Sequence, residues 1–271
     1  GQLVAMPIAA MLDTAPLLNP WCTFWATSLF GGWLVLVILF SLGGPCKLKP
    51  AQAAHHIVMF FPFAFLAANG VRHWFTSSYT VANDSHSRLF AVMPGSEPFS
   101  PTMLGMQIFD FSITSLVPSM RRADAMSHHF VALILSYQLT LTGFLQYWQP
   151  FYFGMLEMSS VPLVFVDFFR ALPNLAKRFD SLNELVRILF AATFIPIRCL
   201  YMPYVSFIWW RDFVGLYRAG DQKVVENILL FACFGGINIF LCGIQQFWGF
   251  KIVHAIQKMA KGDKKGREKE Y

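Results

Sequence analysis

Charged side chains are scarce in this sequence. Asp, Glu, Lys and Arg make up 13% of its 271 residues, against about 25% in an ordinary soluble domain. Hydrophobic residues make up 56%, and the 29 Phe and 8 Trp are of the types that cover lipid-facing helices and interfacial belts. The composition disfavours a soluble fold and indicates a single membrane domain, because apolar stretches occupy most of the length.

Cysteine is also rare, and its spacing argues against two classes of protein. The five cysteines include no Cys-x-x-Cys pair and are odd in number, so neither a disulfide framework nor a zinc site is expected. Cys22 and Cys46 flank the first apolar stretch and would lie roughly 36 Å apart on a helix, too far for a disulfide. Phosphate-binding glycine loops, the dinucleotide fingerprint and His-Glu-x-x-His are absent, so no metal or cofactor is predicted.

Basic residues give the chain a formal net charge of +6, and much of the excess lies after Lys251. Acidic residues are interspersed in this tail, and it lacks the interleaved aromatic side chains that stack on bases. A basic segment next to a membrane helix typically fixes topology and contacts anionic headgroups. We therefore expect membrane lipids, and no nucleic acid, as partners.

Seven apolar stretches are long enough to cross a bilayer, which takes about twenty residues. They predict an all-α polytopic fold of about seven transmembrane helices, with a lead-in and first helix over 1–52, a membrane domain over 53–256 and a basic tail over 257–271. The stretches are Trp21–Leu42, Ala53–Trp74, Pro101–Met120, Ser127–Tyr147, Pro150–Phe169, Glu184–Trp210 and Val225–Ile256.

The distribution of Lys and Arg predicts the orientation. With seven spans, fourteen basic residues fall on the side of the C-terminus and five on the opposite side. The positive-inside rule then places the C-terminus on the cytosolic, matrix or stromal side. The longest loop, Phe75–Ser100, lies on the other side and contains the sequon Asn83-Asp84-Ser85, whose glycosylation would place the protein in the secretory pathway.

Ionisable residues interrupt four of the apolar stretches: Asp110, the pair His128 and His129, Glu157, and Arg198. A charge at bilayer depth costs roughly 2.5–3.5 kcal/mol on insertion scales, so such residues usually face a protein interior or a cavity. The sequence therefore predicts a bundle with a polar interior.

Adjacent histidines point about 100° apart on a helix, so at most one of His128 and His129 can face the bundle axis. They form either an interfacial pair bonded to backbone or headgroups, or a general base in a lipid-accessible cavity. Arg198 lies too deep to reach the interface, and its partner is expected to be Asp110, Glu157 or a lipid phosphate.

Six short motifs occur in order along the chain: His55-His56, Ile108-Phe109-Asp110, Ser127-His128-His129 with Ser136-Tyr137, Glu157-Met158-Ser159-Ser160, Phe194 to Arg198, and Trp248 to Lys251. In this order they resemble the motifs of the TLC family, named for TRAM, Lag1 and CLN8, over roughly residues 53–261. The Glu-x-Ser-Ser element is most similar to the TLC-domain-containing and CLN8-like branch.

The resemblance implies a six-helix, barrel-like bundle preceded by one extra helix, with a central cavity that accepts an acyl chain. Ceramide synthases carry His-Asp-x-x-Ser-Asp, and the corresponding stretch from Leu156 to Val161 lacks both aspartates, which argues against ceramide synthesis. If the protein is an enzyme, His128, His129 and Glu157 are its candidate catalytic residues. The candidate lipid-binding residues are His56, Asp110, Ser160, Arg198 and Tyr137.

Three functions remain open. The first is lipid binding or lipid regulation through a polar-lined intramembrane cavity, and the second is a structural accessory role in a larger membrane complex. The third is lipid acyl transfer with a His base. The habit of the family favours the endoplasmic reticulum or another endomembrane, with a mitochondrial or plastid membrane as the alternative.

Overall fold

The structure is a computed structural model that describes residues 15–76 and 84–260. All regular elements within these ranges are helical. Asn83 of the sequon and residues 261–271 of the basic tail lie outside the described residues. The described part therefore confirms an all-α fold.

The first four long helices are unbroken, irregular turns interrupt the following segments, and the last helix is again unbroken. The elements are η1 (Pro16–Leu18), α2 (Pro20–Leu42), α3 (Pro50–Thr76), α5 (Ser85–Phe90), α6 (Phe99–Leu116), η2 (Pro118–Met120), α7 (Ala123–Thr142), η3 (Pro150–Gly154), η4 (Met155–Met158), α8 (Ser160–Ala171), α9 (Pro173–Arg178), α10 (Asp180–Phe194), η5 (Ile195–Tyr201), α11 (Met202–Arg218), α12 (Gln222–Glu226) and α13 (Ile228–Ala260).

Four helical segments within the described residues are long and apolar enough to cross a membrane, or five if a bent pair counts as one span. They are Pro20–Leu42, Pro50–Thr76, Asp180–Arg218, Ile228–Lys258 and the bent pair Pro150–Met158 with Ser160–Ala171. The expected count of seven is thus not confirmed. Helices α6 and α7 fall short because they carry polar residues such as Gln107, Asp110 and His129, which face the interior of the bundle.

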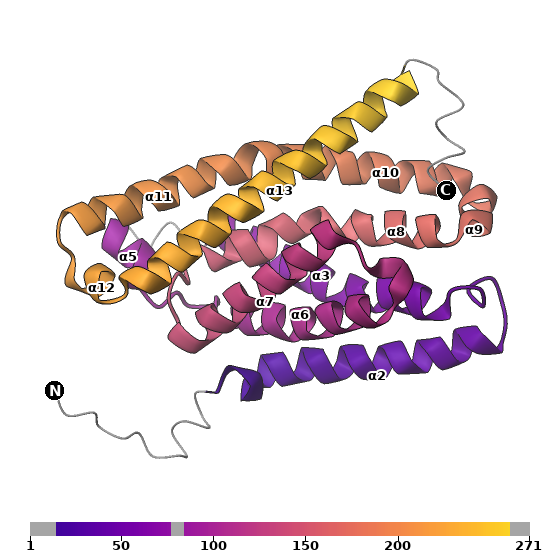
Figure 1. The fold of residues 1–271 in the computed structure, drawn as a ribbon, viewed down its shortest axis with the longest axis horizontal. Coiled ribbons are helices and arrows are strands. Elements are labelled where there is room, and N and C mark those ends of the chain that lie inside the picture. The colour runs from indigo at the N-terminus through magenta and orange to yellow at the C-terminus, as the bar shows by residue number, and fades with distance from the viewer. Residues whose placement is uncertain (1–14, 77–83, 261–271) are drawn as a thin grey trace.

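The long helices lie side by side along the longest axis of the molecule (Figure 1). Helix α2 runs along one edge, where it packs against α3 and α6. Helix α13 crosses the α10–α11 segment diagonally on the opposite side, while α5 and α12 lie at one end of the bundle and α9 at the other. Helix α2 therefore lies at the edge of the bundle, while the division into an extra helix and a six-helix domain stays a prediction.

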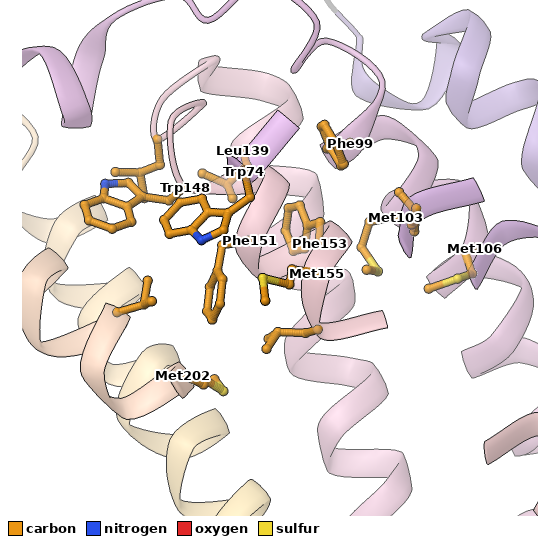
Figure 2. Close-up of a cluster of buried hydrophobic side chains, with 14 of the residues drawn as sticks. Trp74, Phe99, Met103, Met106, Leu139, Trp148, Phe151, Phe153, Met155 and Met202 are labelled. Carbon is orange, nitrogen blue, oxygen red and sulfur yellow. The ribbon is translucent and has the colours of Figure 1, made fainter. Parts of the chain in front are cut away.

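An aromatic and methionine cluster forms the core between α3, α6, α7 and the η3–η4 segment (Figure 2). The ring of Trp74 lies 5.1 Å from that of Phe151 and 6.4 Å from that of Trp148, measured between centroids. The η3 segment can enter because Gly70 of α3 faces Gly154, and a Cβ on Gly70 would lie 2.4 Å from the Gly154 backbone. Two glycines therefore set the distance between these segments.

Several predicted boundaries need correction. Helix α7 begins at Ala123 rather than Ser127 and ends at Thr142, followed by Gly143 in the left-handed conformation at φ 65°, so Tyr147 lies beyond it. The fifth stretch is bent by 46° between Met158 and Ser160.

The predicted loop Phe75–Ser100 contains helix α5, whose Arg88 forms an ion pair with Asp212 of α11 (Nε–Oδ2 2.5 Å). Asp212 is fully buried and also accepts a hydrogen bond from Ser85 (2.9 Å). This buried charge pair fixes α5 to α11, a contact across more than a hundred residues that loop composition does not indicate.

Candidate functional site

A narrow cavity runs through the interior between α6, α7, η3, η4, η5, α11 and α13, with an empty volume of about 810 Å³ including its mouth. Helix α7 contributes residues at intervals of four and three, which extend roughly 16 Å along its axis. The lining residues of α7 are His128, Ala132, Leu135 and Leu139, and those of α13 are Phe234, Ile237, Asn238, Leu241 and Gln245.

The cavity is polar at one end and mostly apolar beyond it. His128 begins the α7 stripe, and Gln245 ends the α13 stripe, so these two lie toward the same end together with Glu157 and Arg198. The rest of the lining consists mostly of apolar side chains that continue the core of Figure 2, including Leu139 and Met202. Such a lining suits a molecule with an apolar body and a polar head.

Arg198 organises the polar wall. It is 6% exposed, and its guanidinium donates to the carbonyl of Leu156 (Nη2–O 2.8 Å), to Ser159 (2.7 Å) and to Ser160 (2.9 Å). Its ion pair is with Glu157 (Nη2–Oε2 3.4 Å). Of the expected partners, the structure therefore selects Glu157 rather than Asp110.

Irregular helical segments make this contact possible. Arg198 lies in the π-helical η5, which accommodates Pro196. On the facing segment the helix is interrupted at Ser159, between η4 and α8. A broken helix leaves the Leu156 carbonyl free to accept two hydrogen bonds from Arg198 (2.8 and 3.1 Å). π-helical turns are frequent at functional sites.

Asp110 joins two histidines from different helices. Its Oδ1 lies 2.7 Å from Nε2 of His55 on α3, and its Oδ2 lies 3.1 Å from Nδ1 of His129 on α7. Gln107 Oε1 also lies 3.3 Å from His129 Nδ1. The ring of His55 stacks on Phe109 with centroids 5.6 Å apart. The buried aspartate thus connects α3, α6 and α7 below the cavity wall.

The two adjacent histidines of α7 have different surroundings. His129 turns to Asp110, whereas His128 lines the cavity and packs edge-on against Trp248 of α13 (5.4 Å between centroids). The indole of Trp248 donates to Asp124 Oδ2 (3.0 Å) and so holds α13 against the start of α7. One histidine faces the cavity and the other supports the wall, as the angular separation requires.

Three buried polar atoms of the lining have no hydrogen-bond partner among the described residues: His128 Nδ1, Trp148 Nε1 and Gln245 Oε1. An unsatisfied buried donor or acceptor costs about 1–3 kcal/mol. A guest in the cavity would offset this cost only if these side chains turned toward it, because the three atoms are covered by protein in this structure.

A neutral polar network around Tyr152 and Asn238 of the lining was missed in the sequence. Tyr152 and Ser206 share a hydrogen bond (2.9 Å), and Asn238 donates to both (3.2 and 3.0 Å). Trp210 donates to Asn238 Oδ1 (3.2 Å). Ser and Asn inside apolar stretches were the available signal, but neutral polar residues are common in membrane helices and bond across them.

The remaining candidate residues lie outside the cavity lining. His56 is buried edge-on against His55 (5.3 Å), and its Nε2 has no partner among the described residues. Ser160 is buried under Arg198. Tyr137 is 37% exposed on the outer face of α7. No group of three or more His, Cys, Asp or Glu within residues 15–76 and 84–260 could hold a metal ion.

Comparison with known proteins gives one match. The family model described as TLC domain matches residues 52–254, about three quarters of the chain. No curated protein and no solved structure matches. The match includes the segments that contribute every residue of the cavity lining.

Proposed function

The chain belongs to the TLC domain family, and on this premise we propose that it binds a membrane lipid in its interior cavity and so regulates membrane lipids. It is an integral membrane protein with several apolar helices. The observation that carries the proposal is the mixed lining of the cavity: His128, Gln245 and Arg198 lie toward one end, and mostly apolar side chains line the rest.

A lipid satisfies both parts of this lining. Its acyl chain would lie along Ala132, Leu135 and Leu139, where burial contributes about 0.8 kcal/mol per methylene. Its polar head would accept from or donate to His128 and Gln245, beside the guanidinium of Arg198. A charged or hydrogen-bonding head is favoured there because the surrounding protein excludes water.

Native mass spectrometry of the gently extracted protein tests the proposal. We expect a lipid adduct on the 30.8 kDa chain that survives detergent exchange. The substitution Ile237→Trp should remove it, because Ile237 is half-buried and lines the cavity, so an indole would occupy the space of the chain.

Ile239→Trp is the matched control, since Ile239 is two positions away on α13 and 62% exposed. It should keep the adduct. An adduct that persists in Ile237→Trp, or is lost equally in both variants, would rule out the cavity as the site.

Acyl transfer is a second candidate function, favoured by His128, which lines the cavity and whose Nδ1 has no hydrogen-bond partner among the described residues. His128 would accept a proton from a lipid hydroxyl or amine while that group attacks the acyl carbon of an ester or thioester. The tetrahedral intermediate would then collapse with cleavage of the bond to the original alcohol or thiol, which leaves with the proton returned by His128. His129 and Glu157 would then act as positioning residues, because Asp110 and Arg198 already occupy them.

His128→Gln tests this candidate. We expect loss of acyl transfer by about 10²–10⁴-fold with the lipid adduct retained, while Tyr137→Phe on the outer face of α7 should leave turnover unchanged. Turnover that is unaffected by His128→Gln would exclude His128 as the base.

We infer that ceramide synthesis is not the reaction, because the stretch around Glu157 lacks the two aspartates of that pattern. We also propose that the C-terminus faces the cytosol, matrix or stroma and that the protein resides in an endomembrane. An accessory role would appear in native mass spectrometry as a large assembly with fixed stoichiometry.

A further inference from the structure

A groove opens on the outside of the bundle where α13 leaves α10. At the crossing point, a Cβ on Gly249 would come within 2.3 Å of Cys199 Sγ, and Gln246 donates to the Cys199 carbonyl (3.0 Å). Beyond it the C-terminal part of α13 diverges from α10 (Figure 1), and Phe250 is 72% exposed. This α10–α13 groove has an empty volume of about 1530 Å³ and shares no lining residue with the interior cavity.

One face of α10 lines the groove along most of its length, at intervals of three and four residues. The lining is charged at the start of the helix and apolar further on. It consists of Lys177, Asp180, Asn183, Glu184, Arg187, Ile188, Ala191, Ala192, Ile195, Pro196 and, from α13, Ile256. A polar mouth followed by an apolar stripe is the arrangement of an amphiphile-binding surface.

The length of the stripe matches one leaflet of a bilayer. From Glu184 to Pro196 the helix rises about 18 Å, slightly more than half of the ~30 Å hydrocarbon core. A partner's transmembrane helix would need an apolar surface across both leaflets. A single phospholipid needs only a headgroup site and an acyl path of this depth.

The charges at the mouth identify the headgroup. Lys177 and Arg187 are basic, while Asp180 and Glu184 are acidic, so the mouth carries both signs in balance. Glu184 and Arg187 are three positions apart, and their Cβ atoms lie roughly 5–6 Å from each other. Two opposite charges at this spacing complement a zwitterionic headgroup rather than a purely anionic one.

The chemistry of the mouth separates two zwitterions. Carboxylates accept short charge-assisted hydrogen bonds from a primary ammonium group. A quaternary ammonium has no N–H and is usually recognised by aromatic faces, and none of the described residues that line the groove is aromatic. The lining therefore favours an ethanolamine headgroup over choline.

We propose that the α10–α13 groove is a binding site for phosphatidylethanolamine, separate from the interior cavity. Its phosphate lies against Lys177 and Arg187, its ammonium donates to Asp180 and Glu184, and one acyl chain follows α10 to Pro196. The site does not depend on the proposed cavity function.

The test uses the full chain in nanodiscs that contain equal amounts of phosphatidylethanolamine, phosphatidylcholine and phosphatidylglycerol, followed by native mass spectrometry. We expect retained phosphatidylethanolamine to exceed phosphatidylcholine. Asp180→Asn with Glu184→Gln should reduce this preference about fivefold, the effect of losing two exposed charged contacts. Ala191→Trp should remove the bound lipid by filling the stripe.

Two variants outside the groove serve as controls. Glu226→Gln on α12 and Ala232→Trp on the exposed face of α13 repeat the same types of change and should leave the preference intact. Ile237→Trp, which fills the interior cavity, should also retain phosphatidylethanolamine, so failure at one site is distinguishable from failure at the other. Equal retention of the two zwitterions, or a signal that Ala191→Trp does not change, would overturn the proposal.

Discussion

The guanidinium of Arg198 joins two helical segments whose backbones are both irregular. It donates to the Leu156 carbonyl and to two serines, and it pairs with Glu157. Because the guanidinium is buried, these groups would all lose a charge-assisted hydrogen bond or an ion pair at once if Arg198 were shortened. The energetic consequence should exceed that of any exposed pair in the chain.

We predict that Arg198→Met destabilises the protein by about 3–5 kcal/mol, because Glu157 would be left as an uncompensated buried charge. The double variant Arg198→Met with Glu157→Gln should lose much less, since no charge then remains unpaired. Thermal unfolding of the purified variants measures both, and Arg122→Ala, which breaks an exposed pair with Asp124, gives the baseline. A double variant as unstable as the sum of the singles would contradict the coupling.

At this scale the sequence identified Arg198, Asp110 and the His pair, because a charge in an apolar stretch is visible without a structure. The choice of partners was not visible. Asp110 and Glu157 were both possible for Arg198, and only the bend at Ser159 brings Glu157 to it. The role of Asp110 between His55 and His129 depends on the packing of three helices, which residue spacing does not contain.

Among the elements, the η3–η4 segment packs backbone to backbone against α3. Its Gly154 faces Gly70 of α3, where an added Cβ would meet backbone atoms at 2.4 Å. Backbone cannot rotate away as a side chain can, so either the two segments separate or the bend changes. Since η4 carries Leu156 and Glu157, a shift here would also displace the partners of Arg198.

Gly70→Ala should therefore lower stability by about 1–3 kcal/mol, the usual cost of overpacking, and reduce lipid retention. Gly31→Ala on α2 is the matched control, because an added Cβ there has nothing within 4 Å. That control should be neutral or more stable by up to about 1 kcal/mol, the helix-propensity difference. The melting temperatures of the two variants measure this difference. Equal melting temperatures would contradict the close approach of Gly70 and Gly154.

The elements were only partly predictable. The long apolar stretches predicted α2, α3, the α10–α11 segment and α13, because the hydropathy of a segment can be calculated from its residues alone. The π-helical segments and the 46° bend depend on glycine contacts and on Pro196, so they appear only when neighbouring helices are placed. Helix α5 lies in a segment predicted to be a loop. The helix has only six residues, and the ion pair that fixes it is with Asp212, which lies far along the chain.

For the whole molecule, polarity is inverted relative to a soluble protein. Asp110, Glu157, Arg198 and Asp212 are buried, whereas Leu229, Phe250 and many other apolar side chains are exposed. The exterior is thus suited to lipid tails and the interior to hydrogen bonds. The lipid that we propose for the interior cavity would then be part of the folded state.

Removal of lipid should consequently lower the stability of the whole protein. A ligand that binds only the folded state contributes about 2.7 kcal/mol at a hundred times its dissociation constant, which corresponds to a shift of about 5 °C or more in melting temperature for a chain of this size. We expect prolonged delipidating detergent to reduce the melting temperature of the wild type and added lipid extract to restore it. Ile237→Trp should show a smaller response, because its indole fills the cavity, while Ile239→Trp should respond like the wild type. If all three proteins respond equally, the stabilising lipids lie on the outer surface and the interior cavity holds none.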